Sequence, residues 1–434
     1  MRLLHISPHY GGGVGNVVSA LCADLTAHGV DNRIISLDKS NYNPFVDSSI
    51  FFLPYHLSKD ASRRISELIQ DADIVLCHYW NHPLISYFLS TFHFSNTKLL
   101  FWFHTSGFHP LNPIPSRFYE LPVTTIFSTS ASFELIDTEL TSSYLNTFSI
   151  HSTRDLSSFL SSSNERHYRS RPNNLLCIGT LSRQKLHRKS TQLFIDLAES
   201  YQITFAGDPS GSDLYNTLAC HPNIRFVGFK KDIIPYLLAA DCFIYPLSPD
   251  HYGTGEQVIL EAMASGLPVV CLDNSPEKAI IINDQTGILC SDISDIYEST
   301  VKLMSEPTRI LQFSKNSSRH IQENFSSNIQ SNKFLSLIFE NTTLLPQFNG
   351  CAFNFFLPDN PLSSMVNGSF STKEIHYLNP LKNTKNILSI LADLYKQKKI
   401  ANLLQFDSKG SPLQYLKYFP NSPSINAICS EICF

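Results

Sequence analysis

The chain has 434 residues, which is enough for two or three domains. Its hydrophobic share of 43% can supply a buried core for each of them, whereas charged residues make up only 16%. The formal net charge of −4 leaves no basic excess to neutralise a phosphate backbone. This balance argues against nucleic acid as the main partner.

The ten cysteines mostly lie inside apolar runs, as buried free thiols do, and no pair has zinc-finger spacing. This usage favours a reducing compartment. The first apolar run is too short for a signal peptide, and no run of about 18 apolar residues could span a membrane. We therefore expect a cytoplasmic protein. The cluster Lys396–Lys399 is too small to predict membrane binding. Peripheral contact with the inner face of a membrane therefore stays an open question.

Apolar runs alternate with helical patterns along residues 1–152. The run Leu3–Ser7 is followed by a glycine-rich turn at 9–15 and by a helical pattern over Asn16–His28. Further strands are expected at 33–37, 74–77, 99–103 and 124–127. This alternation predicts an N-terminal domain with a parallel sheet covered on both faces.

A serine-rich, charged segment at 153–174 predicts a linker, and a second alternating series follows it. Its strands are expected at 175–178, 202–206, 224–227, 242–245 and 268–272. Residues 175–345 are thus predicted to form a second doubly wound domain, which binds ligands outside the carboxyl ends of its strands. Residues 346–434 form a C-terminal extension of unknown role.

The segment 246–270 contains the clearest motif, a strand that ends in a glycine-containing loop before a helix. That loop holds Gly253, Thr254, Gly255 and Glu256. Thr254 fits the N-cap, with Gln257 completing a capping box. The unpaired N–H groups and the helix dipole can hold a diphosphate, and Glu261 can accept hydrogen bonds from ribose hydroxyls. Such a turn is equally typical of an ordinary capped helix.

This segment resembles the C-terminal signature of the retaining GT-B glycosyltransferases of family 4 (glycosyl transferases group 1). The family has a Glu-x7-Glu pattern that ends in Glu-Ala-Met-Ala-x-Gly-x-Pro-Val-Val. Glu261 matches its second glutamate, whereas the first falls on Gly253. Glu256 is the nearest carboxylate, but five helical residues place it about 140° around the helix from Glu261.

Three further segments match the family. Lys185 falls on a lysine that holds the donor diphosphate, whereas the family's arginine position holds Thr180 and Arg183 is displaced by three. Glu277 follows Asn-Ser-Pro and can contact the sugar or ribose, or simply begin a helix. Gly12 and Gly13 belong to a turn that lines the donor side of the cleft in the family.

Histidines follow two strands of the N-terminal domain. His104 comes directly after the strand 99–103, where the family places a histidine beside the reacting sugar. His78 and His82 have His-x3-His spacing but follow a strand and lack a third ligand nearby, so no metal site is expected. Asp38 at the end of the second strand keeps dinucleotide binding open as a competing interpretation.

The resemblance implies an α/β protein of GT-B type, with two Rossmann-like doubly wound domains facing a central cleft. It implies a metal-independent, retaining hexosyltransferase of polysaccharide biosynthesis, without a cofactor. The partners would be a nucleoside diphosphate sugar and a glycan or glycolipid acceptor; the oligomeric state is open. His104, Lys185 and Glu261 are the predicted catalytic residues. The alternatives are a degenerate binding subunit of a glycan-assembly complex and a nucleotide-sugar epimerase.

Overall fold

The computed structural model describes most of the chain. The described residues are 1–38, 58–109, 112–115, 118, 121–136, 146–179, 181, 185–207, 213–249, 251, 253, 257–340, 347–350 and 411–432. The chain forms two compact units. The first contains Met1–Ile150 and Ser331–Phe434, and the second contains His151–Gln330.

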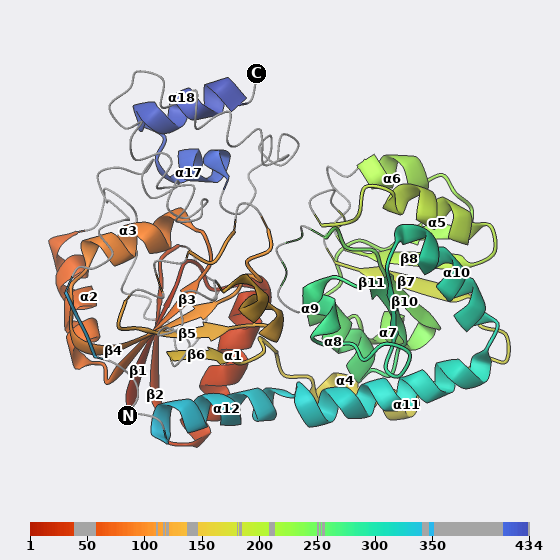
Figure 1. Ribbon diagram of the computed structural model, residues 1–434, viewed down its shortest axis with the longest axis horizontal. Coiled ribbons are helices and arrows are strands. Elements are labelled where there is room, and N and C mark those ends of the chain that lie inside the picture. The colour runs from red at the N-terminus through yellow and green to blue at the C-terminus, as the bar shows by residue number, and fades with distance from the viewer. Residues whose placement is uncertain are drawn as a thin grey trace. The chain divides into compact units, whose positions relative to one another are not determined.

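The first unit is built on a mainly parallel sheet in the order β2-β1-β3-β4-β5-β6, with β13 pairing antiparallel to β4 (Figure 1). Its strands are β1 (Arg2–Ser7), β2 (Asp31–Ser36), β3 (Ile74–Tyr79), β4 (Phe94–Phe103), β5 (Thr124–Phe127), β6 (Thr147–Ser149) and β13 (Gln347–Gly350). The helices α1 (Gly12–Ala27), α2 (Lys59–Asp71) and α3 (Pro83–Thr91) connect the first four strands.

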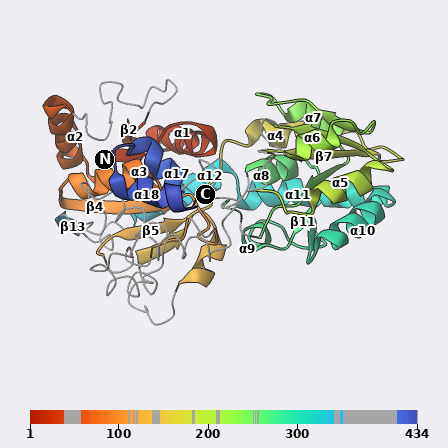
Figure 2. The same cartoon turned by 90° about the horizontal axis from the view of Figure 1, so that it is seen from above.

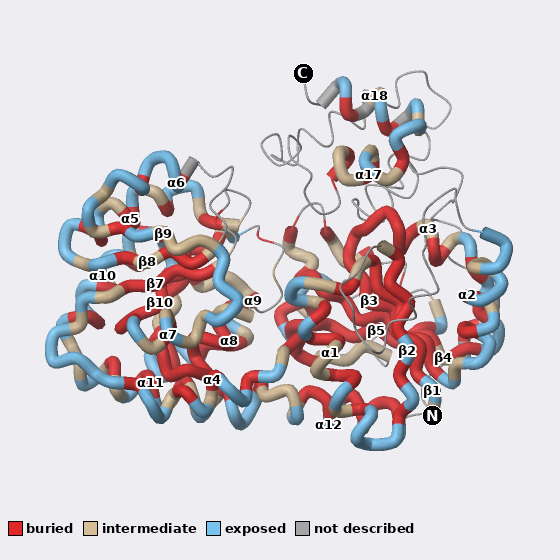
Figure 3. Tube along the Cα trace, turned by 180° about the vertical axis from the view of Figure 1, so that it is seen from behind, coloured by how far each residue is buried: buried red, intermediate tan, exposed pale blue. Residues whose placement is uncertain are grey.

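The central strand β3 is buried at every residue, which explains why its sequence is mostly apolar (Figure 3). Leu76 and Trp102 on one face pack in a core with Leu21 of α1. On the other face, Phe101 shares a core with Phe88 of α3. Helix α1 begins at Gly12, four residues before the expected start, because Gly15 N–H already donates to Gly11 C=O.

The second unit has a parallel sheet in the order β12-β11-β10-β7-β8-β9. Figure 2 labels its strands β7 and β11. Its strands are β7 (Asn174–Ile178), β8 (Gln202–Ala206), β9 (Ile224–Phe226), β10 (Cys242–Tyr245), β11 (Val269–Leu272) and β12 (Ile288–Cys290). Its helices are α4 (Ser157–Ser162), α5 (Ser190–Ala198), α6 (Asp213–Leu218), α7 (Ile234–Ala239), α8 (Gln257–Ala264), α9 (Ser275–Lys278), α10 (Ile293–Met304) and α11 (Pro307–Asn324). The prediction of two doubly wound, Rossmann-like folds is confirmed.

The segment expected to be a linker is part of the second unit. Leu156 and Phe159 belong to its core, and α4 lies within the segment. Buried Arg166 donates to the carbonyls of Leu237, Ala240 and Ser265, at 2.7, 2.8 and 3.0 Å. These bonds attach residues 153–174 to the second unit.

The second unit ends at Gln330, before the expected boundary at 345. The reason is helix α12 (Ser327–Phe339), whose Phe334 and Ile338 lie in the core of the first unit. The Phe334 ring stacks on Trp102 at 5.9 Å. The chain therefore returns to the first unit within α12.

The C-terminal extension also belongs to the first unit. Its described elements are β13 and the helices α17 (Pro412–Tyr418) and α18 (Pro423–Ile432). Helix α17 packs against α3 through fully buried Tyr415. A helix expected near 386–399 lies outside the described residues. No helix within the described ranges is long and apolar enough to cross a bilayer.

Candidate functional site

The strand order places a topological switch point in the second sheet between β7 and β10. From β7 the chain moves outward to β8 and β9, and it then returns to the other side of β7 to form β10, β11 and β12. The loops after β7 and β10 therefore both leave the carboxyl edge of the sheet at this switch point, the place where doubly wound sheets bind ligands. Lys185 and the segment 246–257 belong to these two loops.

Lys185 lies at this edge, where the two loops pair with each other through their backbones. Ser248 N–H donates to Lys185 C=O at 2.8 Å, and His187 N–H donates to Pro246 C=O at 2.8 Å. An antiparallel bridge joins Leu186 to Leu247 between these bonds. The backbone of Lys185 is thus fixed beside the loop that follows β10.

The Lys185 ammonium group lies over the end of β7. Its Nζ is 5.6 Å from the centre of the Tyr245 ring. A Cβ atom on Gly179 would meet Lys185 Nζ at 3.7 Å and Tyr245 Oη at 2.9 Å, and Gly179 has a φ of +129°. Glycine at 179 therefore leaves room for the lysine head group and satisfies the backbone conformation.

A buried histidine and carboxylate face each other beyond β10 and β11. His251 Nδ1 accepts a hydrogen bond from Gly253 N–H at 3.0 Å, so the imidazole proton is on Nε2. Nε2 lies 3.2 Å from both oxygens of Glu277, and its hydrogen bond is directed to Oε2. The Glu277 side chain is fully buried at the start of the short helix α9.

Two buried polar atoms beside this pair lack hydrogen-bond partners within the described part of the chain. They are Glu277 Oε1 and Asn274 Nδ2, an acceptor and a donor three residues apart. A buried polar atom without a partner costs roughly 1–3 kcal/mol, so such atoms usually serve a ligand or a water molecule. A sugar hydroxyl can donate to an acceptor such as Glu277 Oε1 and accept from a donor such as Asn274 Nδ2.

Glu261 lies on α8 and is paired within the second unit. Its Oε1 accepts from Arg154 Nη1 at 2.9 Å. Burial raises the pKa of Glu261, and the charge and hydrogen bond of Arg154 oppose that shift. Gln257 holds the same segment by accepting from Arg154 N–H and donating to Ser152 C=O. The predicted ribose acceptor therefore already has a cationic partner.

Four predicted donor-binding residues, Arg183, Thr254, Gly255 and Glu256, lie outside the described residues. The predicted donor-binding residues of the second unit that the structure does describe are Lys185, Gly253, Glu261 and Glu277. Of these, Gly253 and Glu277 are joined through His251. Gly12, Gly13 and His104 belong to the first unit.

The first sheet has its own switch point, between β1 and β3. Gly12 and Gly13 form the start of α1 there, and both are exposed. A Cβ atom on Gly13 would meet nothing within 4 Å. The first-turn N–H groups of a helix have no intrahelical acceptor, so these amides can donate to an anion.

His104 ends a row of stacked histidines that crosses the first sheet. His78 lies 5.1 Å from the His104 ring and 5.3 Å from the His5 ring. Burial lowers the pKa of His5 to about 4 and the pKa of His78 well below its usual value. The His5 and His78 rings are therefore neutral near pH 7. In the described ranges, no three His, Cys, Asp or Glu side chains are grouped as a metal site.

The C-terminal helix α17 contacts the loops that follow β2 and β3. Tyr415 Oη donates to Asn81 Oδ1 at 2.9 Å, and Tyr418 Oη donates to Asp38 Oδ2 at 2.7 Å. The Tyr418 ring also lies edge-on to His82 at 5.1 Å. The extension therefore forms part of the carboxyl edge of the first sheet.

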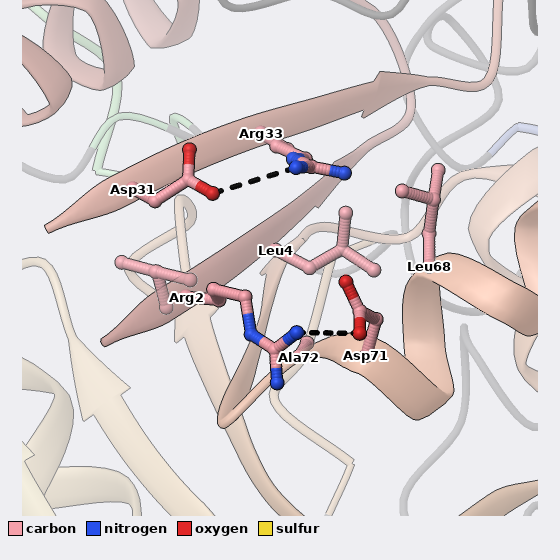
Figure 4. A pocket seen from close by; sticks show the side chains of 8 residues that line it. Arg2, Leu4, Asp31, Arg33, Leu68, Asp71 and Ala72 are labelled. Atoms are coloured by element: carbon pink, nitrogen blue, oxygen red, sulfur yellow. Dashed lines mark hydrogen bonds and ion pairs between the residues drawn. The ribbon is translucent and has the colours of Figure 1, made fainter.

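A separate small pocket lies at the opposite, amino end of this sheet (Figure 4). Exposed ion pairs of Arg2 with Asp71 and of Arg33 with Asp31 border it. None of the predicted site residues lines it. The pocket therefore lies away from the carboxyl ends of the strands, where doubly wound sheets bind ligands.

Sequence reasoning missed Arg154, His251 and Asn274. Arg154 lay in the presumed linker, and its partner is 107 positions away. His251 could have been found, because it stands two residues before Gly253 in the clearest motif. Asn274 stands just before the Ser-Pro-Glu277 turn, but only the structure shows that its amide nitrogen is buried without a partner.

The geometry of the two sheets agrees with comparisons to known proteins. Residues 172–306 match the family model described as glycosyl transferases group 1. This stretch is therefore similar to a group 1 glycosyl transferase domain, and it contains Lys185, His251, Glu261 and Glu277. No curated protein has a sequence that matches the chain at a significant level.

Solved structures that cover about four fifths of the chain show that its two units have the GT-B fold. A glycosyltransferase from Rickettsia africae ESF-5 is 15% identical, with a TM-score of 0.59 over 78% of this chain and 98% of that one. The HepE protein of Anabaena in complex with UDP is 14% identical, with a TM-score of 0.57 over 80% and 100%. The lipopolysaccharide outer core galactosyltransferase WaaB is 15% identical, with a TM-score of 0.54 over 79% and 100%.

Proposed function

We propose that the protein transfers a hexosyl unit from a nucleoside diphosphate sugar to a hydroxyl of a glycan or glycolipid. The observation that carries this proposal is the buried Glu277 in the stretch that matches the group 1 model. Its Oε2 accepts from His251, and its Oε1 has no hydrogen-bond partner among the residues that the structure describes. A site built to bind hydroxyl groups rejects ligands that lack them, which suits a sugar substrate.

The second unit offers groups for each part of the donor. Lys185 would offset charge on the diphosphate as it leaves, at the switch point where α8 also begins. Glu277 and Asn274 would bind hydroxyls of the sugar. The family's first glutamate is replaced by Gly253, and we propose that Glu277, oriented through His251, supplies the missing carboxylate.

Two further observations support the proposal. Gly12, Gly13 and His104 lie at the carboxyl edge of the first sheet, the edge at which doubly wound sheets bind ligands. A structure with the same fold, HepE, holds UDP-glucose. We further propose retention of the anomeric configuration, no need for a metal ion, and a role in polysaccharide or glycolipid assembly in the cytoplasm.

The direct test is release of a nucleoside diphosphate by the purified chain. UDP-, GDP- and ADP-hexoses are each incubated with and without a mixed pool of glycan and glycolipid acceptors, and products are identified by mass and by the anomeric NMR coupling. Acceptor-dependent transfer supports the proposal if the product keeps the anomeric configuration, α or β, of the donor. Release with an epimerised free sugar identifies an epimerase instead. Binding without release of product identifies a non-catalytic subunit.

Gly13 provides a test of donor approach at the first turn of α1. Replacing Gly13 with leucine places a side chain in open space, so the fold accepts it. We expect KM for the donor to rise about tenfold, a loss of about 1.4 kcal/mol in binding. The free energy of unfolding should stay the same or rise by up to about 1 kcal/mol, because leucine favours a helix over glycine.

The matched control for this change is Ala23→Leu, at an exposed position further along α1. It should leave both KM and stability close to those of the natural chain. An unchanged KM in the Gly13 variant would show that this turn is not part of the donor site.

A further inference from the structure

Four side chains form a continuous row of hydrogen bonds across four neighbouring strands. We call Asn32, His5, His78 and His104 the histidine wire. Asn32 is on β2, His5 on β1, His78 on β3, and His104 follows β4, which is the order of these strands in the sheet. The atoms that join them are Asn32 Oδ1 to His5 Nε2 at 3.2 Å, His5 Nδ1 to His78 Nε2 at 3.0 Å, and His78 Nδ1 to His104 Nε2 at 2.9 Å.

The orientation of the Asn32 amide is fixed at the far end of the wire. Its Nδ2 lies near three acceptors, the Cys22 carbonyl at 3.3 Å, Thr26 Oγ1 at 3.0 Å and the Val30 carbonyl at 3.1 Å. A reversed amide would place oxygen against two carbonyl oxygens. Oδ1 therefore faces His5, and this atom can only accept a hydrogen bond.

The proton positions along the wire follow from this one acceptor. His5 Nε2 carries a proton, because a bare nitrogen would face Asn32 Oδ1 at 3.2 Å with no proton between them. Cys22 Sγ lies 3.6 Å from the same nitrogen, and a thiol is a weaker hydrogen-bond partner than the amide oxygen. In a neutral ring His5 Nδ1 then accepts from His78 Nε2, and His78 Nδ1 accepts in turn from His104 Nε2. The result is a His104 ring with its proton on Nε2 and its lone pair on Nδ1.

Burial keeps the inner rings in these states. All three rings are at least nine-tenths buried, and desolvation disfavours a charged His5 or His78. A second proton on His78 Nδ1 would point at the N–H of His104, and one on His5 Nδ1 would point at the N–H of His78. Packing also restrains the last ring, since Trp102 stacks on His104 at 5.6 Å.

We propose that Asn32, His5 and His78 are positioning residues that fix the tautomer of His104, so that its Nδ1 acts as a hydrogen-bond acceptor toward a sugar hydroxyl. The second half of this inference rests on the proposed transferase function, whereas the first half concerns the protein alone. A histidine that is free to change tautomer would present a donor instead of an acceptor in part of the molecules.

The tautomer can be measured without any substrate. Two-bond nitrogen–proton NMR correlations of histidine-labelled full-length protein show which ring nitrogen carries the proton, and the His104 signals are assigned by their loss in His104→Gln. We expect a single His104 species protonated on Nε2. A proton on Nδ1, or a mixture of tautomers in the natural chain, would overturn the proposal, and this measurement needs no variant of the inner rings.

Two variants of His5 separate positioning from simple packing. His5→Phe keeps a ring of similar size but gives His78 no acceptor, so both tautomers of His104 should appear and kcat/KM should fall about tenfold. In His5→Gln the amide oxygen can accept from His78 and the amide nitrogen can donate to Asn32, so one tautomer and most of the activity should return.

Equal losses in the two variants, with one unchanged tautomer in both, would show a structural role only and would overturn the proposal. If the natural chain shows the expected tautomer but transfers no sugar from any donor, the transferase function fails and the role toward a sugar hydroxyl fails with it. The fixed tautomer would still stand, so the two failures can be told apart.

Discussion

Replacing Lys185 with methionine is expected to lower kcat by roughly 100- to 1000-fold, because a preorganised charge at a site of developing negative charge has an effect of that size. The lysine backbone is held by Ser248 and its Nζ lies over the Tyr245 ring. Methionine keeps the length and most of the apolar contact, so the free energy of unfolding should change by less than about 1 kcal/mol. Steady-state kinetics with the identified donor measure the effect.

The control for this experiment is Lys302→Met, which removes the same charge from an exposed position on α10 of the same unit. It should leave kcat within about twofold, since exposed charges at a distance are screened by salt. If the two variants lose the same activity, the Lys185 charge has no special place in the reaction.

Glu277→Gln should lower kcat/KM for the donor by about 10- to 100-fold. Hydrogen bonds to charged groups contribute about 1.5–3 kcal/mol, and the substitution removes the charge while keeping the shape. The glutamine oxygen can still accept from His251 Nε2, so the contact between α9 and the loop after β10 remains. Stability should therefore change little, and donor titration by calorimetry together with kinetics measures the loss.

Glu298→Gln, at an exposed position on α10, is the matched control and should behave as the natural chain does. A further comparison with His251→Gln distinguishes orientation from direct binding. Because His251 acts only through Glu277, the His251→Gln variant should weaken donor binding less than Glu277→Gln does. Unchanged donor affinity in Glu277→Gln would contradict the assignment of this carboxylate to the sugar.

Much of the fold could be predicted because the strands of a doubly wound sheet are buried on both faces. The apolar runs at 74–77 and 242–245 are short and bounded by turns, and they became β3 and β10. The carboxyl ends of such strands carry ligands, which is why Lys185 and His104 could be selected from sequence. Strand β13 could not be predicted, because it pairs with β4 across about 250 positions.

The contacts inside the site were less predictable, since they join residues that are distant in sequence. Nothing in the serine-rich segment indicates that Arg154 pairs with Glu261. The histidine wire depends on strand order, because only the sequence β2-β1-β3-β4 brings Asn32, His5 and His78 side by side. The placement of α17 against α3 likewise follows from Tyr415, whose burial is a property of the folded chain.

The central claim is that the protein has a donor site for a nucleotide sugar. The most direct test is thermal unfolding of the full chain with UDP-, GDP-, ADP- and CMP-sugars, with NAD and NADP as controls. A ligand at 100 times its Kd stabilises the folded state by about 2.7 kcal/mol, which gives a clear rise in Tm. We predict such a rise with one class of nucleotide sugar and its reduction in Glu277→Gln. A rise with NAD or NADP alone would contradict the claim and indicate dinucleotide binding.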